Sequence, residues 1–147
     1  MKAIPKRTLL VTCIIILLPM FFGLALWNRL PERMPTHFDF SGTADDYSGR
    51  PFAVIGLPLF ILAMQLFCAV MLRADPKKQN ISEKMAQLVL WVGPAVSLFV
   101  GISMYLSALG FAINVSRLGM VFVGLIFIVI GNYLPKCRHN YTVGIRL

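Results

Sequence analysis

Apolar residues are gathered into four long stretches that contain no charged residue and are separated by polar segments. A helix needs about 20 apolar residues to cross a hydrocarbon layer of about 30 Å, and each stretch comes close to that length. The pattern therefore predicts four membrane-spanning helices, at about residues 8–27, 52–72, 85–109 and 118–134. We expect residues 1–147 to form one membrane domain, an all-α, polytopic four-helix transmembrane bundle.

The composition excludes a water-soluble globule. Hydrophobic residues make up 58% of the 147-residue chain and charged residues 14%, whereas an ordinary soluble domain has about 45–50% apolar and about 25% charged residues. The first apolar stretch exceeds the core of a secretory signal peptide, and no small-x-small cleavage site follows Trp27. We expect this stretch to remain as a membrane anchor.

The basic residues predict the orientation. Ten of the 14 Lys and Arg residues lie in the N-terminus, the second loop and the tail, and four lie in the first and third loops. Because basic loops stay on the inner side, both termini are predicted to be cytoplasmic in a multi-pass plasma-membrane protein. The formal net charge of +8 would suggest nucleic acid in a soluble chain. Here the cations flank the spans, so no direct nucleic-acid binding is expected.

The first loop, residues 28–51, is predicted to be an ordered outer surface. It has 24 residues, whereas helix connections commonly need about 2–8. It contains several turn-forming Pro and Gly residues, and Thr36–Phe40 alternates like a short extended segment. We expect this loop to bind a ligand, through Pro35, His37, Asp39, Asp45 and Asp46.

Two other interpretations of the outer-loop carboxylates are open. With His37 they could ligate a metal ion, but their spacing matches no standard metal loop, so no metal and no cofactor are expected. Alternatively, Asp39, Asp45 and Asp46 form Asx turns or pair with the arginines of the same loop and hold it on the helix ends. Those arginines are Arg29, Arg33 and Arg50.

The basic tail, residues 135–147, is the second candidate surface. Lys136 and Arg138 would lie at the level of the inner headgroups. A cytoplasmic protein partner would meet the residues Lys136, Arg138, Asn140 and Arg146. A surface that only attracts anionic lipids would use the same side chains.

The spans themselves predict packing rather than chemistry. They contain no ionisable Asp, Glu, Lys, Arg or His. In ion-coupled transporters, such residues often mark the path of the ion through the membrane. A small permease or transporter accessory subunit for an amphipathic molecule stays open as the alternative function, if residues such as Gln65, Gln87 and Asn132 share a polar cavity. Small residues in the spans would let neighbouring helices approach closely: Ser97, Gly101, Gly119, Gly124 and Gly131.

His37 with Asp39 in the first loop is the one plausible acid–base pair, and no nucleophile accompanies it, so no enzyme is expected.

Two segments resemble the SdpI family of bacterial immunity proteins. The outer loop, Leu30-Pro31-x-x-x-Pro35-Thr36-His37-Phe38-x-x-x-Gly42-x-x-Asp45, is similar to the family's N-terminal module of unknown biochemical role. The tail, Gly131-Asn132-Tyr133-Leu134-Pro135-Lys136-x-x-x-Asn140-Tyr141-x-x-Gly144-Ile145-Arg146, is similar to its second signature. Family members typically continue with a Pro-Trp-Thr-like motif and two further spans. The resemblance therefore implies either a chain truncated at its C-terminus or a short natural member.

The resemblance implies a function that residue patterns alone do not. The family protects the producing cell against a secreted peptide or protein toxin, and its best-known member also holds a cytoplasmic repressor at the membrane. We therefore expect a membrane immunity and signalling protein whose outer loop meets the toxin and whose inner face meets the repressor or anionic lipids. The oligomeric state is not predicted.

Overall fold

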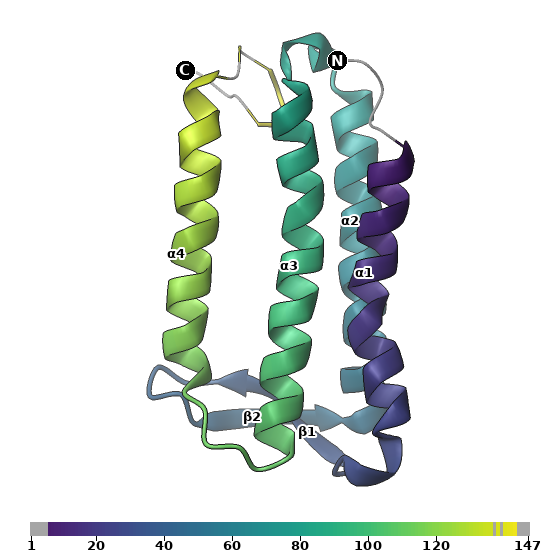
Figure 1. The fold of residues 1–147 in the computed structure, drawn as a ribbon, viewed down its shortest axis with the longest axis vertical. Helices are drawn as coiled ribbons and strands as arrows, with labels where there is room; N and C mark the ends of the chain where they lie inside the picture. The colour runs from purple at the N-terminus through teal and green to yellow at the C-terminus, as the bar shows by residue number, and fades with distance from the viewer. Residues whose placement is uncertain (1–5, 137, 139, 144–147) are drawn as a thin grey trace.

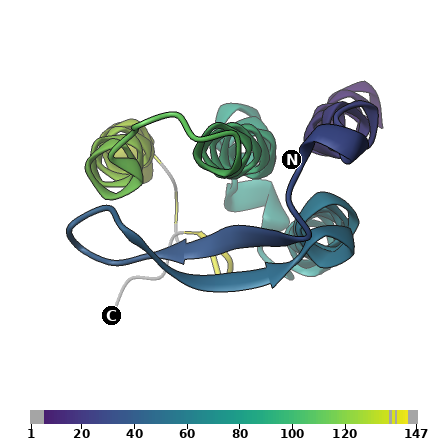
Figure 2. The same cartoon turned by 90° about the horizontal axis from the view of Figure 1, so that it is seen from below.

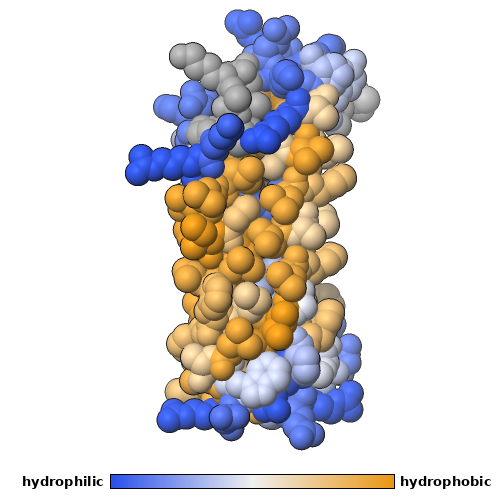
Figure 3. All heavy atoms as spheres, turned by 90° about the vertical axis from the view of Figure 1, so that its right-hand side faces the viewer, coloured by the Kyte–Doolittle hydropathy of each residue, from blue (hydrophilic) through white to orange (hydrophobic). Residues whose placement is uncertain are grey.

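Four antiparallel helices stand side by side in the computed structural model, which describes residues 6–136, 138 and 140–143. They are α1 (Lys6–Ala25), α2 (Leu57–Ala74), α3 (Glu83–Ala108) and α4 (Val115–Tyr133), and a π-helical turn at Phe52–Gly56 leads into α2 (Figure 1). Each helix is long and apolar enough to cross a membrane, if the π-helical turn from Phe52 is counted with α2. An apolar belt separates two hydrophilic ends (Figure 3). The predicted all-α, four-helix transmembrane bundle is confirmed.

Polar caps set where two of the helices begin. The Ser82 hydroxyl oxygen accepts a hydrogen bond of 3.2 Å from the Met85 N–H at the start of α3. The Asn114 side-chain oxygen accepts one of 2.9 Å from the Arg117 N–H at the start of α4. Such caps satisfy N–H groups that have no partner within the helix. The Asn114 cap starts α4 at Val115 and includes Arg117 in its first turn. The helix therefore begins before the charge-free stretch, residues 118–134, from which it was predicted.

The first loop folds into an antiparallel β-hairpin of β1 (Arg33–Phe38) and β2 (Ala44–Gly49). The hairpin lies across one end of the bundle, and its tip reaches α4 (Figure 2). The extended segment expected at Thr36–Phe40 is confirmed only as far as Phe38: the strand begins earlier, and Asp39 and Phe40 belong to the turn. β2 was not predicted, because Ala-Asp-Asp-Tyr-Ser-Gly lacks alternating apolar residues.

Buried side chains attach the hairpin to the helices. Leu30 and Met34 are buried in one cluster with Ala53, Val54, Met104 and Tyr105. The Arg50 guanidinium donates hydrogen bonds of 2.8 and 2.9 Å to the carbonyl oxygens of Trp27 and Leu30, and it stacks 4.7 Å from the Trp27 ring centre. The loop is thus an ordered part of the fold.

Helices α1, α2 and α3 form the core and are joined by buried hydrogen bonds. The Gln65 amide on α2 donates to Thr12 Oγ1 on α1 at 3.1 Å and to the Leu90 carbonyl on α3 at 2.8 Å. The Tyr105 hydroxyl donates to the Pro19 carbonyl at 2.8 Å. A Cβ atom on Gly101 would lie 2.6 Å from Pro19 Cβ, so this glycine permits close contact between α1 and α3.

Helix α4 packs much less closely. Of its residues, all of which are described, Val115 alone is buried. The rings of Phe99 and Phe122 stack 4.4 Å apart between α3 and α4, but a hollow of about 290 Å³ also separates the two helices. A Cβ on Gly124 or Gly131 would meet nothing within 4 Å, so the close helix contact expected at these two glycines is absent.

Candidate functional site

The hairpin tip is tied to the start of α4, and we call this junction the outer clasp, after the side that the charge pattern predicts for the first loop. The Asn114 side-chain amide donates a hydrogen bond of 2.9 Å to the Ser41 carbonyl oxygen, and the Ser116 hydroxyl donates one to the Asp39 carbonyl oxygen. Gly42 has a φ of +90° and lies against Asn114, where a Cβ atom would come within 2.5 Å of the side-chain oxygen. The turn therefore requires glycine for its conformation and for the close approach.

Asp39 shapes this tip. Its carboxylate accepts hydrogen bonds from the Ser41 hydroxyl at 2.6 Å and from the Thr43 N–H at 2.9 Å. These bonds stabilise the charged form and lower the pKa of Asp39 below its ordinary value. Asp39 is thus an ionised turn residue beside the N-terminus of α4.

His37 and Asp45 form an ion pair across the two strands. His37 Nδ1 lies 2.6 Å from Asp45 Oδ1, and both side chains are exposed. The hydrogen bond to Asp45, then its charge, raise the pKa of His37, and the charges of Asp46 and Asp39 act in the same direction. The imidazole is therefore protonated over a wider pH range than a free histidine.

A hollow of about 410 Å³ opens between the hairpin and α4. We call it the outer hollow, and its lining residues are His37, Phe38, Asp39, Phe40, Asp45, Ser116 and Met120. The Phe40 side chain is 97% exposed at its edge, although an aromatic ring normally gains from leaving water. The hollow combines carboxylates with aromatic and thioether groups, which suits a ligand that is both cationic and apolar.

The arginines of the loop do not neutralise these carboxylates. Arg50 bonds to backbone carbonyls as described above, and Arg33 donates to the Tyr47 carbonyl at 3.4 Å. Within the described residues the ion pair that forms is His37–Asp45. The Asx-turn interpretation holds for Asp39, whereas the alternative of Asp–Arg pairs is not seen in this part of the chain.

Three of the five predicted outer-loop residues line the outer hollow, and two do not. His37, Asp39 and Asp45 line the outer hollow together. Pro35 of β1 is buried on the side of the hairpin that faces the helices. There it lines a smaller hollow of about 100 Å³ with residues of α2 and α3. Asp46 is exposed next to Asp45 and accepts a hydrogen bond of 2.8 Å from the Tyr47 N–H. Ser116 and Met120 of α4 were missed, because only the tertiary fold brings them to the hairpin.

At the opposite end, Asp75 holds the tail, and we call this junction the inner clasp, after the side that the charge pattern predicts for the tail. Asp75 Oδ2 accepts hydrogen bonds from the Tyr141 N–H at 3.1 Å, the Thr142 N–H at 2.9 Å and the Thr142 hydroxyl at 2.5 Å. Its Oδ1 accepts one of 2.7 Å from the Lys77 N–H. Asp75 is only 4% exposed. Burial raises the pKa of Asp75, but the hydrogen bonds from Thr142, Lys77 and Tyr141 together lower it by more than burial raises it. The pKa of Asp75 therefore lies below its ordinary value.

Sequence reasoning missed Asp75, although one signal was available. It is the acidic residue closest to the end of α2, in a loop that otherwise carries several cations. A buried acid is rare unless it is paired or hydrogen-bonded, and here backbone N–H groups supply the bonds. Lys77 also lies over the Tyr141 ring, 5.0 Å from its centre, so the second loop and the tail lie side by side.

The tail residues predicted to meet a partner differ in exposure. Asn140 is fully buried: its side-chain oxygen accepts hydrogen bonds of 3.2 and 2.7 Å from the N–H groups of Thr142 and Val143, and its amide donates one of 2.8 Å to the Arg138 carbonyl. It shapes the turn and does not present itself to a partner. Arg138 is exposed. The Lys136 side chain and Arg146 lie outside the described residues.

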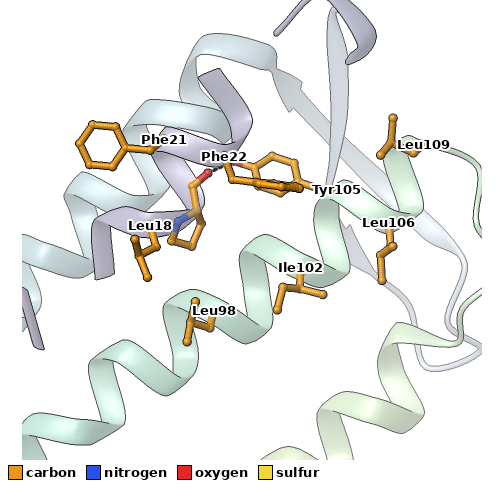
Figure 4. A pocket seen from close by; sticks show the side chains of 9 residues that line it. Leu18, Phe21, Phe22, Leu98, Ile102, Tyr105, Leu106 and Leu109 are labelled. Atoms are coloured by element: carbon orange, nitrogen blue, oxygen red, sulfur yellow. Dashed lines mark hydrogen bonds between the residues drawn. The ribbon is translucent and has the colours of Figure 1, made fainter. Parts of the chain in front are cut away.

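A second large hollow, of about 580 Å³, runs between α1 and α3 (Figure 4). Leu18, Phe21 and Phe22 line it from α1, while Leu98, Ile102 and Leu106 line it from α3. The Tyr105 hydroxyl is turned inward to Pro19. Water needs several polar partners to occupy a hollow, so this groove suits hydrocarbon.

Two of the polar residues that a permease could use, Gln65 and Asn132, lie apart. Gln65 is buried in the three-helix core with both donors bonded. Asn132 is exposed on α4. Among the described residues, no three His, Cys, Asp or Glu side chains are placed to hold a metal ion.

Comparison with known families identifies one domain. A DUF1648 domain, a domain of unknown function, is found at residues 14–62. It covers most of α1, the whole hairpin and the beginning of α2, while α3, α4 and the tail lie outside it. The residues that line the outer hollow from the hairpin are thus within DUF1648, and those from α4 are not. No curated protein matches the chain. No solved structure matches it either.

Proposed function

We propose that this chain is a non-enzymatic immunity and signalling protein of the bacterial plasma membrane, similar to the SdpI family. Its outer hairpin binds a secreted peptide or protein toxin, and its inner face holds a cytoplasmic repressor. The outer loop that resembles the family's N-terminal module lies within the DUF1648 match, which supports this proposal.

The outer hollow is the observation that carries the proposal. It is lined by two carboxylates, an imidazole, two aromatic rings and a methionine, and it lies between the hairpin and the first turns of α4. Arg33 and Arg50 are bonded to the backbone and do not neutralise these carboxylates. Asp45 is paired with His37 at the exposed rim. A cationic, amphipathic peptide complements such a surface, because its basic groups meet Asp39 and Asp45 while its apolar groups meet Phe40 and Met120.

The inner face supplies the surface for the cytoplasmic partner. Arg73, Lys78 and Lys84 are exposed in or beside the second loop, and Arg138 is exposed in the tail. The inner clasp places these two segments together. An acidic patch on a repressor, or anionic lipid headgroups, would meet this surface, and lipid attraction alone contributes about 1 kcal/mol per basic residue.

Two neighbouring carboxylates allow a matched test of the outer site. Asp45→Asn removes a charge from the lining of the outer hollow, whereas Asp46→Asn removes the same charge from the next residue of β2, which is not among the residues that line it. Cells carrying each variant are challenged with the secreted toxin of a producing strain. We expect Asp45→Asn to reduce survival and Asp46→Asn to retain it, at equal amounts of protein in the membrane.

Each other result has a clear meaning. Equal protection by both variants and the wild type would refute toxin binding in the outer hollow. Loss of the protein from the membrane with Asp45→Asn would make Asp45 a structural residue, and His37→Gln, which keeps Asp45 and removes the imidazole, then tests the same hollow.

A further inference from the structure

Helix α4 is held mainly at its two ends. The outer clasp joins its first turn to the hairpin tip through Asn114 and Ser116. At the other end a short segment leads from Tyr133 to the tail residues that bind Asp75 in the inner clasp. Figure 1 shows α4 extending between the hairpin and the tail, apart from α1 and α2.

Between the clasps, α4 makes few contacts: Phe122 stacks on Phe99 of α3, and Ile130 packs against the buried cluster near the tail. Its residues beyond Val115 are not buried, and a hollow of about 290 Å³ separates it from α3. By contrast, α3 has nine buried residues along its length. Close packing makes helices move as one body, whereas a helix with few buried contacts shifts at low cost in free energy.

The outer hollow is built partly from α4 itself. Ser116 and Met120 line it opposite His37, Asp39 and Asp45. Ser116 also makes one of the two hydrogen bonds of the outer clasp. A ligand that fills the hollow therefore touches both the hairpin and α4, and it contacts the residue that joins them.

We propose that α4 couples the outer hollow to the inner tail: occupation of the hollow opens the outer clasp, shifts α4 and releases the tail from Asp75. This inference rests on the proposed function for its ligand, but the coupling is a property of the fold. A ligand shifts such an equilibrium only by its preference for one of the two states. The contact with Ser116 provides that preference, because it competes with the hydrogen bond that defines the closed state.

The test opens the outer clasp by mutation, so it requires no ligand. Val143 packs partly buried against the cluster of Leu72, Ile81 and Met85, and Val143→Cys reports release of the tail by its rate of maleimide labelling. The protein is held in nanodiscs, where both ends are accessible, and Cys13, Cys68 and Cys137 are replaced by Ser. The outer-clasp variant combines Asn114→Asp with Ser116→Ala. Aspartate keeps the oxygen that caps α4 and removes the amide that bonds to Ser41.

Two further variants provide reference labelling rates. Asp75→Asn opens the inner clasp directly and defines the labelling rate of a released tail. Thr36→Ala with Ser48→Ala removes a hairpin hydrogen bond of 3.0 Å between β1 and β2 without touching α4. We expect the outer-clasp variant to raise the rate at least about fivefold toward that of Asp75→Asn. The Thr36–Ser48 control should stay near the parent rate.

The coupling is overturned if the outer-clasp variant labels at the parent rate while Asp75→Asn labels faster. It is equally overturned if Asp75→Asn leaves the rate unchanged, because the inner clasp then does not hold the tail. Neither result bears on toxin binding, which the survival assay with Asp45→Asn measures separately.

Discussion

The Ser97 hydroxyl on α3 donates a buried hydrogen bond of 2.7 Å to the backbone carbonyl of Ile16 on α1. Both residues are buried, so the bond forms in the interior of the bundle. In a membrane, side-chain hydroxyls commonly bond across neighbouring helices. The bond therefore joins α1 and α3 directly.

The first prediction follows from this contact. Ser97→Ala should lower the free energy of unfolding by about 0.5–1.5 kcal/mol, as expected for hydrogen bonds between membrane helices. The measurement is reversible unfolding in mixed micelles. Ser107→Ala, at a partly buried position farther along the same helix, is the control and should change stability less. Equal effects of the two variants would contradict a specific role for Ser97.

The second prediction concerns two glycines. Gly101→Ala places a Cβ atom 2.6 Å from Pro19 Cβ, whereas Gly124→Ala places one in open space. Overpacking of this kind costs about 1–3 kcal/mol, because α1 and α3 must separate. The second change instead replaces a poor helix former by a good one. Thermal unfolding should therefore show a lower midpoint for Gly101→Ala and an equal or higher midpoint for Gly124→Ala; the reverse order would disprove the α1–α3 contact.

The third prediction is the titration of His37. Its pKa is raised above the ordinary value of 6.5, first by the hydrogen bond to Asp45 and then by the charge of Asp45. The pair therefore contributes its full stabilisation below that value and loses it as the pH rises through the raised pKa. NMR of the imidazole protons, in a His139→Gln background, should give a midpoint above 6.5. Asp45→Asn should lower this midpoint, and an unchanged midpoint would exclude the pair.

The fourth prediction concerns orientation. Ser41 at the hairpin tip and Gln79 in the second loop are both exposed, and they lie at opposite ends of the bundle. With the three native cysteines replaced, a membrane-impermeant maleimide should label Ser41→Cys on intact cells and leave Gln79→Cys unlabelled until the membrane is opened. The opposite pattern would invert the proposed topology and place the outer hollow in the cytoplasm.

The number of helices and the ordered first loop could be predicted from the sequence alone. Both depend on properties that act locally: the length of charge-free stretches needed to cross hydrocarbon, and turn residues in a segment too long to be a connector. The sequence also marked His37, Asp39 and Asp45, because this loop holds four of the six acidic residues of the chain together with a histidine.

Tertiary structure alone decided which of these residues act together. Pro35 and Asn140 are buried in the folded protein, and Ser116 and Met120 of α4 lie beside the hairpin. Tertiary structure also gave Asp75 the tail as its partner, 67 residues away in the chain. Such contacts depend on how helices pack and on which buried polar groups find hydrogen bonds, and neither is a property of any local stretch of sequence.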